Sequence, residues 1–586
     1  MEYNNEYNLD LYPKKLRWKE GDLTATRTTM WSGPGCHEGC QVIFYTDEND
    51  KLVKVEGDPN SPFNQGRLCM RCLELPELVN HESRLKYPMK RARNERGQDT
   101  WERISWDEAY EIIEKNVRKF QEESGPESII SMIGTGRNVS QVIAHNQYAN
   151  FGGPDLTLCF LSGDSCMLPR TALCYVVMGN QWVADMSQFR DRRYEEDEDW
   201  KVPGCIVLWG TNPVVCNSDA FLGHWIVEAM KRGSELISVD PQLTWIGSRA
   251  KYWLRLRPGT DAALALGMMN VIINEDLYDH EFVEKWCYGF EELKERVQEY
   301  PPEKVAEICW VDKDTLIEAA RFYAKSNPST IQWGLAVDMS KIGTQTALAI
   351  ADLAGITGNI DNPGGNILID QAGGLEFGYN SGIEYLKEGM VEKRLGNSKY
   401  PLKKSGFTAS SQSDAILDAI ETGKDEKGDP RPVRMLWIQS SNPIANMGQD
   451  APRIYRAMDK VDFICDIDMF MTPFASACAD LLLPCAMSNE RDCVRVWFDP
   501  IRSLTKTGSY YEAKEDEQIM IDLGHRLAPE LWPEWVQTPR DYMNWRMQTA
   551  PDCRFDSMEE LEEAGGWYYH PFRYFKHENG LLRPDG

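Results

Sequence analysis

The chain has 586 residues, of which 42% are hydrophobic, and a formal net charge of −27 at pH 7. A chain of this length exceeds what one hydrophobic core can organise, so several domains are expected. The excess of acidic residues argues against nucleic-acid binding, because such a surface repels the phosphate backbone. No stretch approaches roughly eighteen consecutive apolar residues, so we expect no membrane span.

The N-terminal residues bear on cellular location. They read MEYNNEYNLDLYPKKLRW and contain neither an apolar h-region nor a twin-arginine pair. Those features are typical of export signals. We therefore expect a cytoplasmic protein, in which cysteines stay reduced and rarely form a disulfide framework.

The first predicted elements are a hairpin and a helix. Residues 41–56 contain two alternating apolar runs on either side of an acidic turn at Asp47–Asp50, a pattern typical of a β-hairpin. Residues 106–122 place apolar side chains at helical spacing, and Ser105 precedes them as a candidate N-cap.

Beyond residue 127, strands and helices alternate. Apolar runs predict strands at 128–134, 203–213, 235–242, 328–334, 434–443 and 461–470. An amphipathic segment at 224–233 predicts a helix between the second and third of them, and this order forms a parallel sheet with a crossover helix. We predict a multi-domain α/β protein with doubly wound, mostly parallel sheets. Ligands of such sheets bind beyond the carboxyl ends of the strands.

One part of this pattern occurs twice. VLWGTNPVV (207–215) and LWIQSSNPIAN (436–446) are each an apolar strand followed by a polar turn that ends in Asn-Pro. In both cases another strand with an aspartate follows, as SVDP at 238–241 and CDID at 465–468. Two related α/β lobes, each holding a similar half of a ligand, would explain the repeat. The alternative is that Asn-Pro is a common turn dipeptide.

Several frequent enzyme motifs are absent. The sequence contains no GxxxxGK[ST], no HExxH and no GxSxG. The segment GPGCHEG (33–39) misses the dinucleotide pattern GxGxxG, because Glu38 occupies the position of the third glycine. A simple nicotinamide dehydrogenase is therefore disfavoured.

Four of the sixteen cysteines are grouped in two pairs near the N-terminus. Cys36 and Cys40 precede the predicted hairpin, and Cys69 and Cys72 follow it. Four thiolates from two loops can form a tetrahedral zinc or iron–sulfur site, and the three-residue spacing of the first pair fits iron–sulfur loops better. Another six cysteines lie in apolar runs and are expected to be small buried hydrophobes: Cys159, Cys174, Cys205, Cys287, Cys309 and Cys465.

Around the paired cysteines the sequence resembles the molybdopterin oxidoreductases, the dimethyl-sulfoxide-reductase superfamily. That family has C-x2-C-x3-C, a hairpin, G-D-P and then R-L-C-x-[KR]-G, and this chain has GPGCHEGC (33–40) and VEGDPNSPFNQGRLCMRC (55–72). The basic residue that lies between cluster and pterin in the family falls on Arg71. The first family cysteine falls on Gly33, which cannot bind iron, and Cys72 replaces the family's glycine.

The resemblance implies a [4Fe–4S] cluster with Cys36, Cys40, Cys69 and Cys72 as the candidate ligands. Cys72 would then be the fourth thiolate. A cluster held by three cysteines and another ligand, or the loss of the cluster, are the alternatives.

A second region of resemblance is GDSCMLPRTAL (163–173). The family's molybdenum or tungsten ligand falls on Cys166, and a soft thiolate suits a metal already held by dithiolene sulfurs. Pro169 and Arg170 complete a Cys-x-x-Pro-Arg arrangement that looks most like the acetylene-hydratase-like and arene-dehydroxylase branches. We expect Cys166, Arg170 and His37 to be the catalytic residues.

The family's cofactor is a bis-molybdopterin guanine dinucleotide, and its binding motifs recur here in the family's order. Turns after parallel strands present backbone N–H groups to pyrophosphate, and glycines allow a close approach. The residues implied as cofactor-binding, besides Arg71, are Trp209, Gly210, Thr211, Asn212, Asp240, Pro241, Gly259, Asp261, Gly358, Asn359, Gly364, Gly365, Ser441, Asn442 and Pro443. For Asp261 a plain N-cap role is an equal alternative.

The expected reaction is a two-electron oxidation, reduction or oxygen or hydroxyl transfer on a small substrate, with electrons exchanged through Arg71 and the cluster with an iron–sulfur partner subunit. A non-redox hydration at the same metal is the alternative. In the acetylene-hydratase-like branch an acid/base carboxylate directly follows the second cluster cysteine, and that place holds His37 here, which either moves protons near pH 7 or only hydrogen-bonds the cluster loop. His145 is expected at the surface.

The resemblance also implies a division of the chain. We expect a Cys-rich iron–sulfur domain at 1–85, one pterin half-site in an α/β domain at 156–335, and the other in 86–155 together with 336–520. Residues 521–586 would lead to a β-barrel domain that closes over the cofactor in the family. A truncated product, a separate chain supplying that domain, and a cofactor-free remnant without chemistry are the alternatives for its absence here.

Overall fold

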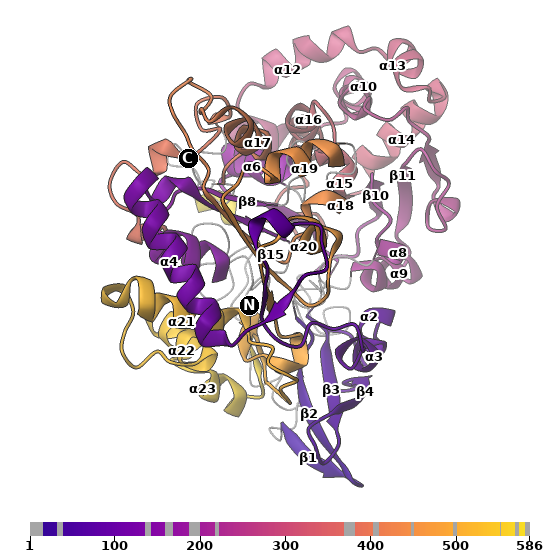
Figure 1. Cartoon of the computed structure of the whole chain (residues 1–586). Coiled ribbons are helices and arrows are strands. Elements are labelled where there is room, and N and C mark those ends of the chain that lie inside the picture. The colour runs from indigo at the N-terminus through magenta and orange to yellow at the C-terminus, as the bar shows by residue number, and fades with distance from the viewer. Residues whose placement is uncertain are drawn as a thin grey trace. The chain divides into compact units, whose positions relative to one another are not determined.

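The computed structural model describes residues 16–31, 39–61, 63–134, 142–158, 168–186, 200–216, 222–368, 381–401, 410–446, 450–495, 501–550, 553–568 and 574–579. The chain divides into two compact units, and Figure 1 labels many of their helices and strands. Unit 1 comprises Met1–Tyr3, Asp164–Asp370 and Pro571–Gly586, and unit 2 comprises Asn4–Gly163 and Gln371–His570.

Unit 1 is organised around a parallel four-stranded sheet with the order β12-β11-β10-β13. The strands are β10 (Cys205–Trp209), β11 (Glu235–Val239), β12 (Tyr252–Leu254) and β13 (Ser329–Trp333). Every residue of β10 is buried, as expected for a central strand with both faces covered. Helix α9 (Leu222–Lys231) connects β10 to β11, which confirms the predicted crossover. A separate antiparallel pair consists of β9 (Trp182–Ala184) and β14 (Asn366–Leu368).

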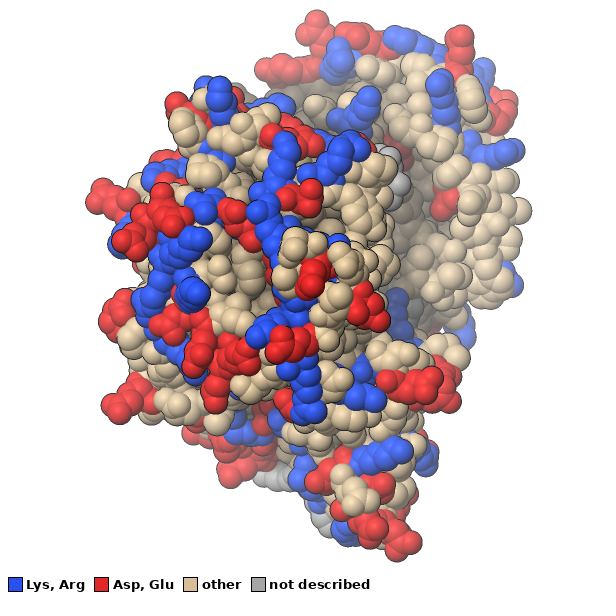
Figure 2. All heavy atoms as spheres, in the orientation of Figure 1, with Lys and Arg blue, Asp and Glu red and all other residues tan. Residues whose placement is uncertain are grey.

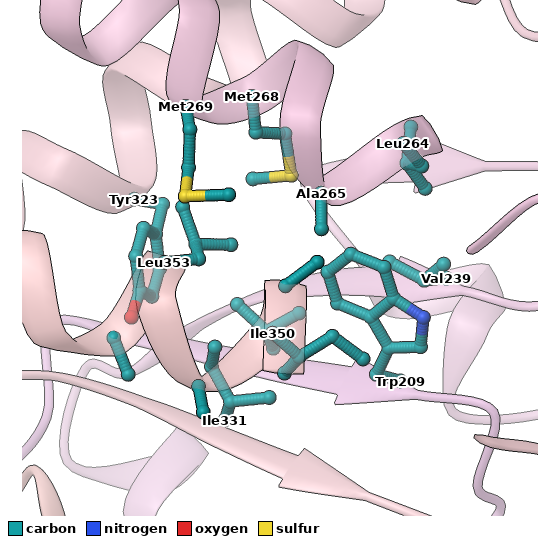
Figure 3. Packing of buried hydrophobic residues seen from close by; sticks show 14 of the residues in the cluster. Trp209, Val239, Leu264, Ala265, Met268, Met269, Tyr323, Ile331, Ile350 and Leu353 are labelled. Atoms are coloured by element: carbon teal, nitrogen blue, oxygen red, sulfur yellow. The ribbon is translucent and has the colours of Figure 1, made fainter. Parts of the chain in front are cut away.

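The core of unit 1 forms where helices pack on this sheet (Figure 3). Met268 and Met269 of α10 (Asp261–Asn274) meet Ile350 and Leu353 of α16 (Gly343–Ile356), with Ile331 of β13 beside them. Nearly all of α10 is buried, which explains why its sequence is apolar on most sides rather than on one stripe. The other α-helices among the described residues of the unit are α6 (Leu168–Met178), α8 (Pro213–Cys216), α11 (His280–Trp286), α12 (Phe290–Arg296), α13 (Pro302–Cys309), α14 (Lys313–Lys325) and α15 (Leu335–Asp338).

The position of α16 differs from the expected domain division. We expected residues from 336 onward to belong to the second α/β lobe, but α16 packs against α10 and α6 and residues up to Asp370 belong to unit 1. The reason is that α16 supplies apolar side chains to the core of unit 1, including Ile350 and Leu353. Periodicity alone reports that a helix is buried and leaves open which sheet buries it.

Unit 2 contains a seven-stranded sheet with the order β6-β5-β17-β16-β15-β7-β8. The strands are β5 (Met89–Lys90), β6 (Glu102–Arg103), β7 (Ile129–Ile133), β8 (Leu156–Leu158), β15 (Met435–Gln439), β16 (Phe463–Asp468) and β17 (Leu481–Pro484). Neighbouring strands from β17 to β8 are parallel, whereas β5 and β6 form an antiparallel edge. The two sheets confirm the predicted α/β class with mostly parallel pairing.

Helix α4 (Trp106–Ser124) of unit 2 forms where the sequence predicted it. The Ser105 side chain accepts a hydrogen bond from Glu108 N, and Gly125 with φ of 81° follows the last turn. Both are the end signals of an α-helix. The other helices of the unit are α2 (Met70–Leu73), α3 (Leu75–Val79), α17 (Ser413–Thr422), α18 (Pro443–Asn446), α19 (Ala451–Met458), α20 (Pro473–Cys478), α21 (Asp516–Leu527), α22 (Pro539–Thr549) and α23 (Met558–Glu563).

The N-terminal part of unit 2 is a four-stranded antiparallel sheet with the order β1-β2-β3-β4. Its strands are β1 (Arg17–Glu20), β2 (Leu23–Thr29), β3 (Gln41–Thr46) and β4 (Leu52–Gly57), and the β3–β4 hairpin confirms the prediction for 41–56. The buried Arg27 side chain pairs with Asp58 at 2.6 Å, directly after β4. Unit 2 also contains the small sheet of β18 (Cys493–Arg495), β19 (Ile501–Leu504) and β20 (Trp567–Tyr568).

Two further observations bear on the function classes considered from the sequence. In the part of the chain that the structure describes, no helix combines the length and the hydrophobicity needed to cross a bilayer. On the face drawn in Figure 2, acidic and basic side chains are interleaved rather than gathered into one positive stripe. Nucleic-acid-binding proteins typically show such a stripe.

Helix α16 offers a matched test of the unit 1 core. Ile350→Ala should destabilise the protein by about 2–5 kcal/mol, because Ile350 is fully buried and its truncation leaves a cavity. Leu348→Ala, two residues earlier on the same helix, should cost less than about 1 kcal/mol, since Leu348 is 38% exposed. Chemical denaturation of both variants would measure the difference, and equal losses would contradict the described packing.

Candidate active site

In unit 1 the chain turns sharply after β10. Gly210 adopts a φ of 58° and donates its N–H to Val239 O at 2.9 Å, while Gly334 N donates to Trp209 O at 2.9 Å. A Cβ on Gly210 would lie 2.7 Å from the Ala336 Cβ, and a Cβ on Gly334 would overlap Gly210 O. Glycine is therefore required at both positions by backbone conformation or by close packing.

Unit 2 repeats this arrangement after β15. Ser440 adopts a φ of 55° and donates its N–H to Ile467 O, while Gly134 N donates to Gln439 O at 3.0 Å. A Cβ on Gly134 would overlap Ser440 O, just as a Cβ on Gly334 in unit 1 would overlap Gly210 O. The sequence echo between 207–215 and 436–446 therefore reflects a repeated backbone geometry and is more than a shared turn dipeptide.

Both turns leave hydrogen-bond donors available. Within the described residues, the backbone N–H groups of Thr211 and Asn212 donate to no protein acceptor, and the same holds for Ser441 and Asn442. The carbonyl oxygens of the two asparagines are used, since they accept from Cys216 N and Asn446 N at 2.9 Å. Pro213 and Pro443 follow and begin the short helices α8 and α18. Free N–H groups in such a turn are what a phosphate group binds.

The side chain of Asn212 also points to a polar ligand at this turn. Its Oδ1 atom is buried and has no hydrogen-bond partner among the described groups. A buried amide oxygen without a partner costs free energy, so native proteins normally supply one. The donors and this oxygen together fit a polar, phosphate-bearing cofactor at the end of β10.

An aspartate stands beside each turn in the same register. Asp240 directly follows β11, and Asp468 is the last residue of β16. If the pairing continued by one residue, Asp240 would stand opposite Gly210, and Asp468 would stand opposite Ser440. The Asp240 Oδ1 atom accepts from Gln242 N at 2.8 Å, and Asp468 Oδ1 accepts from Met469 N and Phe470 N at 2.6 and 3.4 Å. Within the described residues, the second carboxylate oxygen of each aspartate accepts no hydrogen bond.

Burial affects both aspartates. It raises the pKa of the Asp240 carboxyl, and burial together with the charge of Asp516 raises the pKa of Asp468 to about 6. Asp468 was not among the residues singled out from the sequence. The internal echo contained two candidate aspartates, Asp466 and Asp468, and only the strand pairing identifies Asp468 as the counterpart of Asp240.

A second pair of aspartates is used within the fold. Trp209 Nε1 donates to Asp261 Oδ1 at 2.9 Å, and the Gln439 side chain donates to Asp516 in the equivalent place. Asp261 and Asp516 are the first residues of α10 and α21, and Asp516 also pairs with buried Arg491. The N-cap of α10 is Thr260, so the N-cap alternative for Asp261 is wrong. Burial raises the pKa of Asp261.

The predicted glycine-rich loop lies in unit 1 and satisfies most of its own donors. The N–H groups of Gly358, Asn359, Gly364 and Gly365 all bond inside the unit, to Gly355 O, Ala354 O, the Asp185 carboxylate and Asn362 O. The Asn359 side chain accepts from Ser329 N at 2.9 Å and donates to Thr357 Oγ1 at 2.9 Å. These donors hold the loop on β13, so any contact of the loop with a cofactor would use other atoms.

Gly259 and Pro241 are exposed, Gly259 in the turn before α10 and Pro241 directly after Asp240. Gly259 adopts a φ of 84°, and no atom lies within 4 Å of a Cβ placed on it. Their exposure leaves both positions accessible to a ligand.

Arg170 is anchored within unit 1. Its side-chain Nε donates to Asp338 Oδ2 at 2.7 Å, and its backbone N–H donates to Asp338 Oδ1 at 3.1 Å. Its Nη1 donates to Trp333 O at 2.8 Å. Arg170 lies in the first turn of α6, and its partners lie at the end of β13 and in α15. These contacts fix the start of α6 and indicate positioning rather than contact with a substrate.

Three predicted site residues, Cys36, His37 and Cys166, lie outside the described residues. Of the other three predicted cluster ligands, Cys40 and Cys72 are buried and Cys69 is half-buried. A hydrogen bond from the Cys72 side chain lowers the pKa of the Cys69 thiol to about 5, which favours the thiolate that iron binds, and Arg71 adds to this effect. Cys72 also packs in an apolar cluster with Met30 and Phe44.

No three His, Cys, Asp or Glu side chains among the residues with described positions come together as a metal site. The thiolate-favouring contact between Cys69 and Cys72 nevertheless fits an iron–sulfur loop. The exposed Arg71 side chain lies in the last turn of α2, between these two cysteines.

His145 is fully buried, so the expectation of a surface histidine is wrong. Its ring packs against Tyr385, Trp532, Tyr542 and Trp545, with ring centroids 5.1–6.0 Å apart. Burial, followed by the charge of Arg546, lowers the pKa of His145 to about 3. The aromatic residues come from the region after residue 380, which sequence periodicity around position 145 could not reveal.

This histidine generates a pH prediction. Because its folded-state pKa is depressed from 6.5 to about 3, stability is complete above pH 6.5 and falls as the pH drops toward 3. Between pH 7 and pH 5 the loss from this one group is roughly 2 kcal/mol. His145→Phe keeps an aromatic ring and should remove that part of the acid sensitivity. Urea denaturation at both pH values measures it, and an unchanged pH dependence would contradict a neutral buried imidazole.

Comparison with known proteins gives a consistent result. Residues 84–526 match the family model described as molybdopterin oxidoreductase, and residues 34–81 match the molybdopterin oxidoreductase Fe4S4 domain. The latter range contains Cys36, Cys40, Cys69 and Cys72.

Individual relatives cover most of the chain. Acetylene hydratase of Syntrophotalea acetylenica is 32% identical over 532 residues, which is 85% of this chain and 69% of that protein. Formate dehydrogenase H of Escherichia coli (strain K12) is 26% identical over 551 residues, 91% of this chain and 72% of that protein. The solved structure of acetylene hydratase from Pelobacter acetylenicus matches with a TM-score of 0.80 and 28% identity, covering 95% of this chain and 76% of that chain.

Proposed function

This chain belongs to the molybdopterin oxidoreductase family, and we propose that it binds its cofactor as two pterin guanine dinucleotides, one at each of the two matching turns. The family makes it an oxidoreductase with a molybdopterin cofactor and an Fe4S4 domain. The observation that carries the proposal is the repeated turn with unused backbone donors, at Thr211 and Asn212 in unit 1 and at Ser441 and Asn442 in unit 2.

The two aspartates support guanine as the base. Asp240 and Asp468 each keep one carboxylate oxygen in a local turn and have a second oxygen available. Guanine presents two adjacent donors, N1–H and the N2 amino group, to a carboxylate, whereas adenine has an acceptor at N1. We propose that Asp240 binds one guanine and Asp468 the other.

The remaining residues divide the chemistry. When bound, the cofactor supplies a molybdenum or tungsten centre that undergoes two-electron redox. Cys166 would provide the protein thiolate for that metal. Helix α6 begins two residues after Cys166, and the contact of Arg170 with Asp338 would fix the position of that helix. His37 would hold or move a proton beside the cluster loop.

We propose that a separate iron–sulfur protein exchanges electrons with the Cys36–Cys72 region, and that the substrate is a small organic or inorganic molecule.

Analysis of the purified protein tests the cofactor assignment. Metal analysis should give molybdenum or tungsten, and denaturation should release guanine. Adenine, or a protein without pterin and without either metal, would contradict the proposal and favour a cofactor-free remnant.

The two aspartates can then be tested as a pair. Asp240→Asn and Asp468→Asn should each weaken retention of guanine nucleotide by roughly 10-fold to 100-fold, the effect of losing a hydrogen bond to a charged group. Asp314→Asn, on the exposed face of α14, is the matched control and should retain wild-type content. Dialysis followed by base analysis measures retention. Equal loss in all three variants would point to a general folding effect instead.

Hydration at the same metal is the second candidate reaction, favoured by the similarity to proteins named acetylene hydratase. The redox proposal predicts that substrate turnover consumes two equivalents of a reduced or oxidised dye. Water addition without dye consumption would favour the hydratase. Cys166→Ala should abolish either activity.

A further inference from the structure

Two buried carboxylates shape the loop between α16 and β14 in unit 1. Asp361, with a φ of 56°, donates its N–H to Asn366 O at 2.6 Å and accepts from Leu368 N at 3.0 Å through Oδ1. Asp185 accepts from Gly364 N at 2.9 Å through Oδ2. Both aspartates are fully buried, so each needs compensation for its lost hydration.

Residues 574–576, far away in the sequence, contribute to that compensation. Lys576 Nζ lies 2.8 Å from Asp361 Oδ1, and Lys576 N donates to Oδ2 of the same carboxylate. The Tyr574 hydroxyl donates to Asp185 Oδ2 at 2.8 Å. Phe575 N donates to Asp361 O at 2.7 Å, so three consecutive residues bond to the two carboxylate-bearing residues.

The next residue anchors this segment. The buried His577 ring packs against Phe282 and Trp286, with ring centroids 5.3 and 5.2 Å apart. Lys576 itself is only 2% exposed. A lysine this buried is normally found only with a charged partner, so the pair with Asp361 is specific rather than a surface contact.

The loop in turn holds β13. Thr330 Oγ1 donates to Gly365 O at 2.8 Å, and the Asn366 side chain bonds to both Ile331 N and Ile331 O. β13 is the neighbour of β10, and Gly334 at its end packs against Gly210 in the first half-site turn. The contacts therefore run without a break from Lys576 to the turn that we propose binds the cofactor.

We propose that residues 574–576 form a clasp that completes the first cofactor half-site, with Lys576 and Tyr574 as positioning residues. This inference rests on the proposed function of the Gly210–Asn212 turn. Unit 1 is thus complete only when residues that follow all of unit 2 in the sequence have been added. Opening the clasp leaves the Asp361 carboxylate buried without its countercharge, and the loop and β13 lose their fixed position.

Hydrogen exchange tests the clasp without requiring the cofactor. In Lys576→Met the amides of Asp361, Gly364 and Leu368 should exchange on the order of 100-fold faster than in the wild type, since breaking a buried ion pair leaves an uncompensated charge. Tyr574→Phe removes one hydroxyl and should give a smaller increase, confined to Gly364. Arg321→Met is the matched control, because Arg321 pairs with Glu275 and Glu318 on the partly exposed surface of the same unit.

A double variant separates a specific clasp from general damage. In Asp361→Asn with Lys576→Met both charges are gone, asparagine tolerates the positive φ at 361, and its amide oxygen still accepts from Leu368 N. Exchange in the double variant should be on the order of tenfold slower than in Lys576→Met, and pterin retention should be closer to wild type than in either single variant. Additive losses in the double variant, or wild-type exchange in Lys576→Met, would overturn the clasp.

Pterin retention during dialysis links the clasp to the half-site. Lys576→Met should lose pterin on the order of tenfold faster than wild type and Arg321→Met, measured as fluorescence of the released pterin. Faster exchange with unchanged pterin loss would overturn the positioning role. A wild-type protein that never contains pterin would instead refute the proposed function, while the exchange pattern would still decide whether the clasp exists.

Discussion

The close approach of a glycine to the first turn residue after a central strand governs both halves of this molecule. Gly334 lies against Gly210, and Gly134 lies against Ser440, with no room for a side chain at either glycine. The backbone turns with a positive φ at Gly210 and Ser440, and within the part of the chain that the structure describes the next two N–H groups have no protein acceptor. A turn with free donors at the carboxyl end of a parallel sheet is the recurring solution for binding phosphates. The cofactor assignment, the aspartates beside each turn and the repeated sequence all depend on it.

The two lobes share this backbone but differ in their chemistry. In unit 1 strand β10 ends in Trp209, whose neutral indole donates its N–H to the buried Asp261 carboxylate. In unit 2 the corresponding Gln439 binds Asp516, which also pairs with Arg491, while Arg491 additionally binds Glu517 at 2.8 Å. Buried ion pairs of this kind add little net stability compared with apolar packing, although removing one partner is costly. The repeat has therefore kept its geometry while its supporting contacts have diverged.

Sequence reasoning located the strands and turns because their signals are local. The hairpin at 41–56, the helix after Ser105 and the strands that end in Trp209 and Gln439 form where hydrophobic periodicity placed them. It misjudged residues whose partners are distant. His145 is surrounded by rings from the region after residue 380, α16 belongs to unit 1 because of contacts with α10, and the donors of the 358–365 loop are used by the protein itself. Asp468 was overlooked although the repeat pointed to it, because pairing register requires a sheet.

The sequence by itself determined the α/β class, the two Asn-Pro turns, the order of the motifs and hence the family. Each of these depends on residues that lie close together along the chain. Only the tertiary structure decided that Arg170 is held by Asp338, that Asp240 and Asp468 occupy equivalent positions, and that Lys576 neutralises Asp361. Buried charges explain the difference. An isolated aspartate in a sequence looks like a surface residue, and its partner becomes visible only when folding removes both from water.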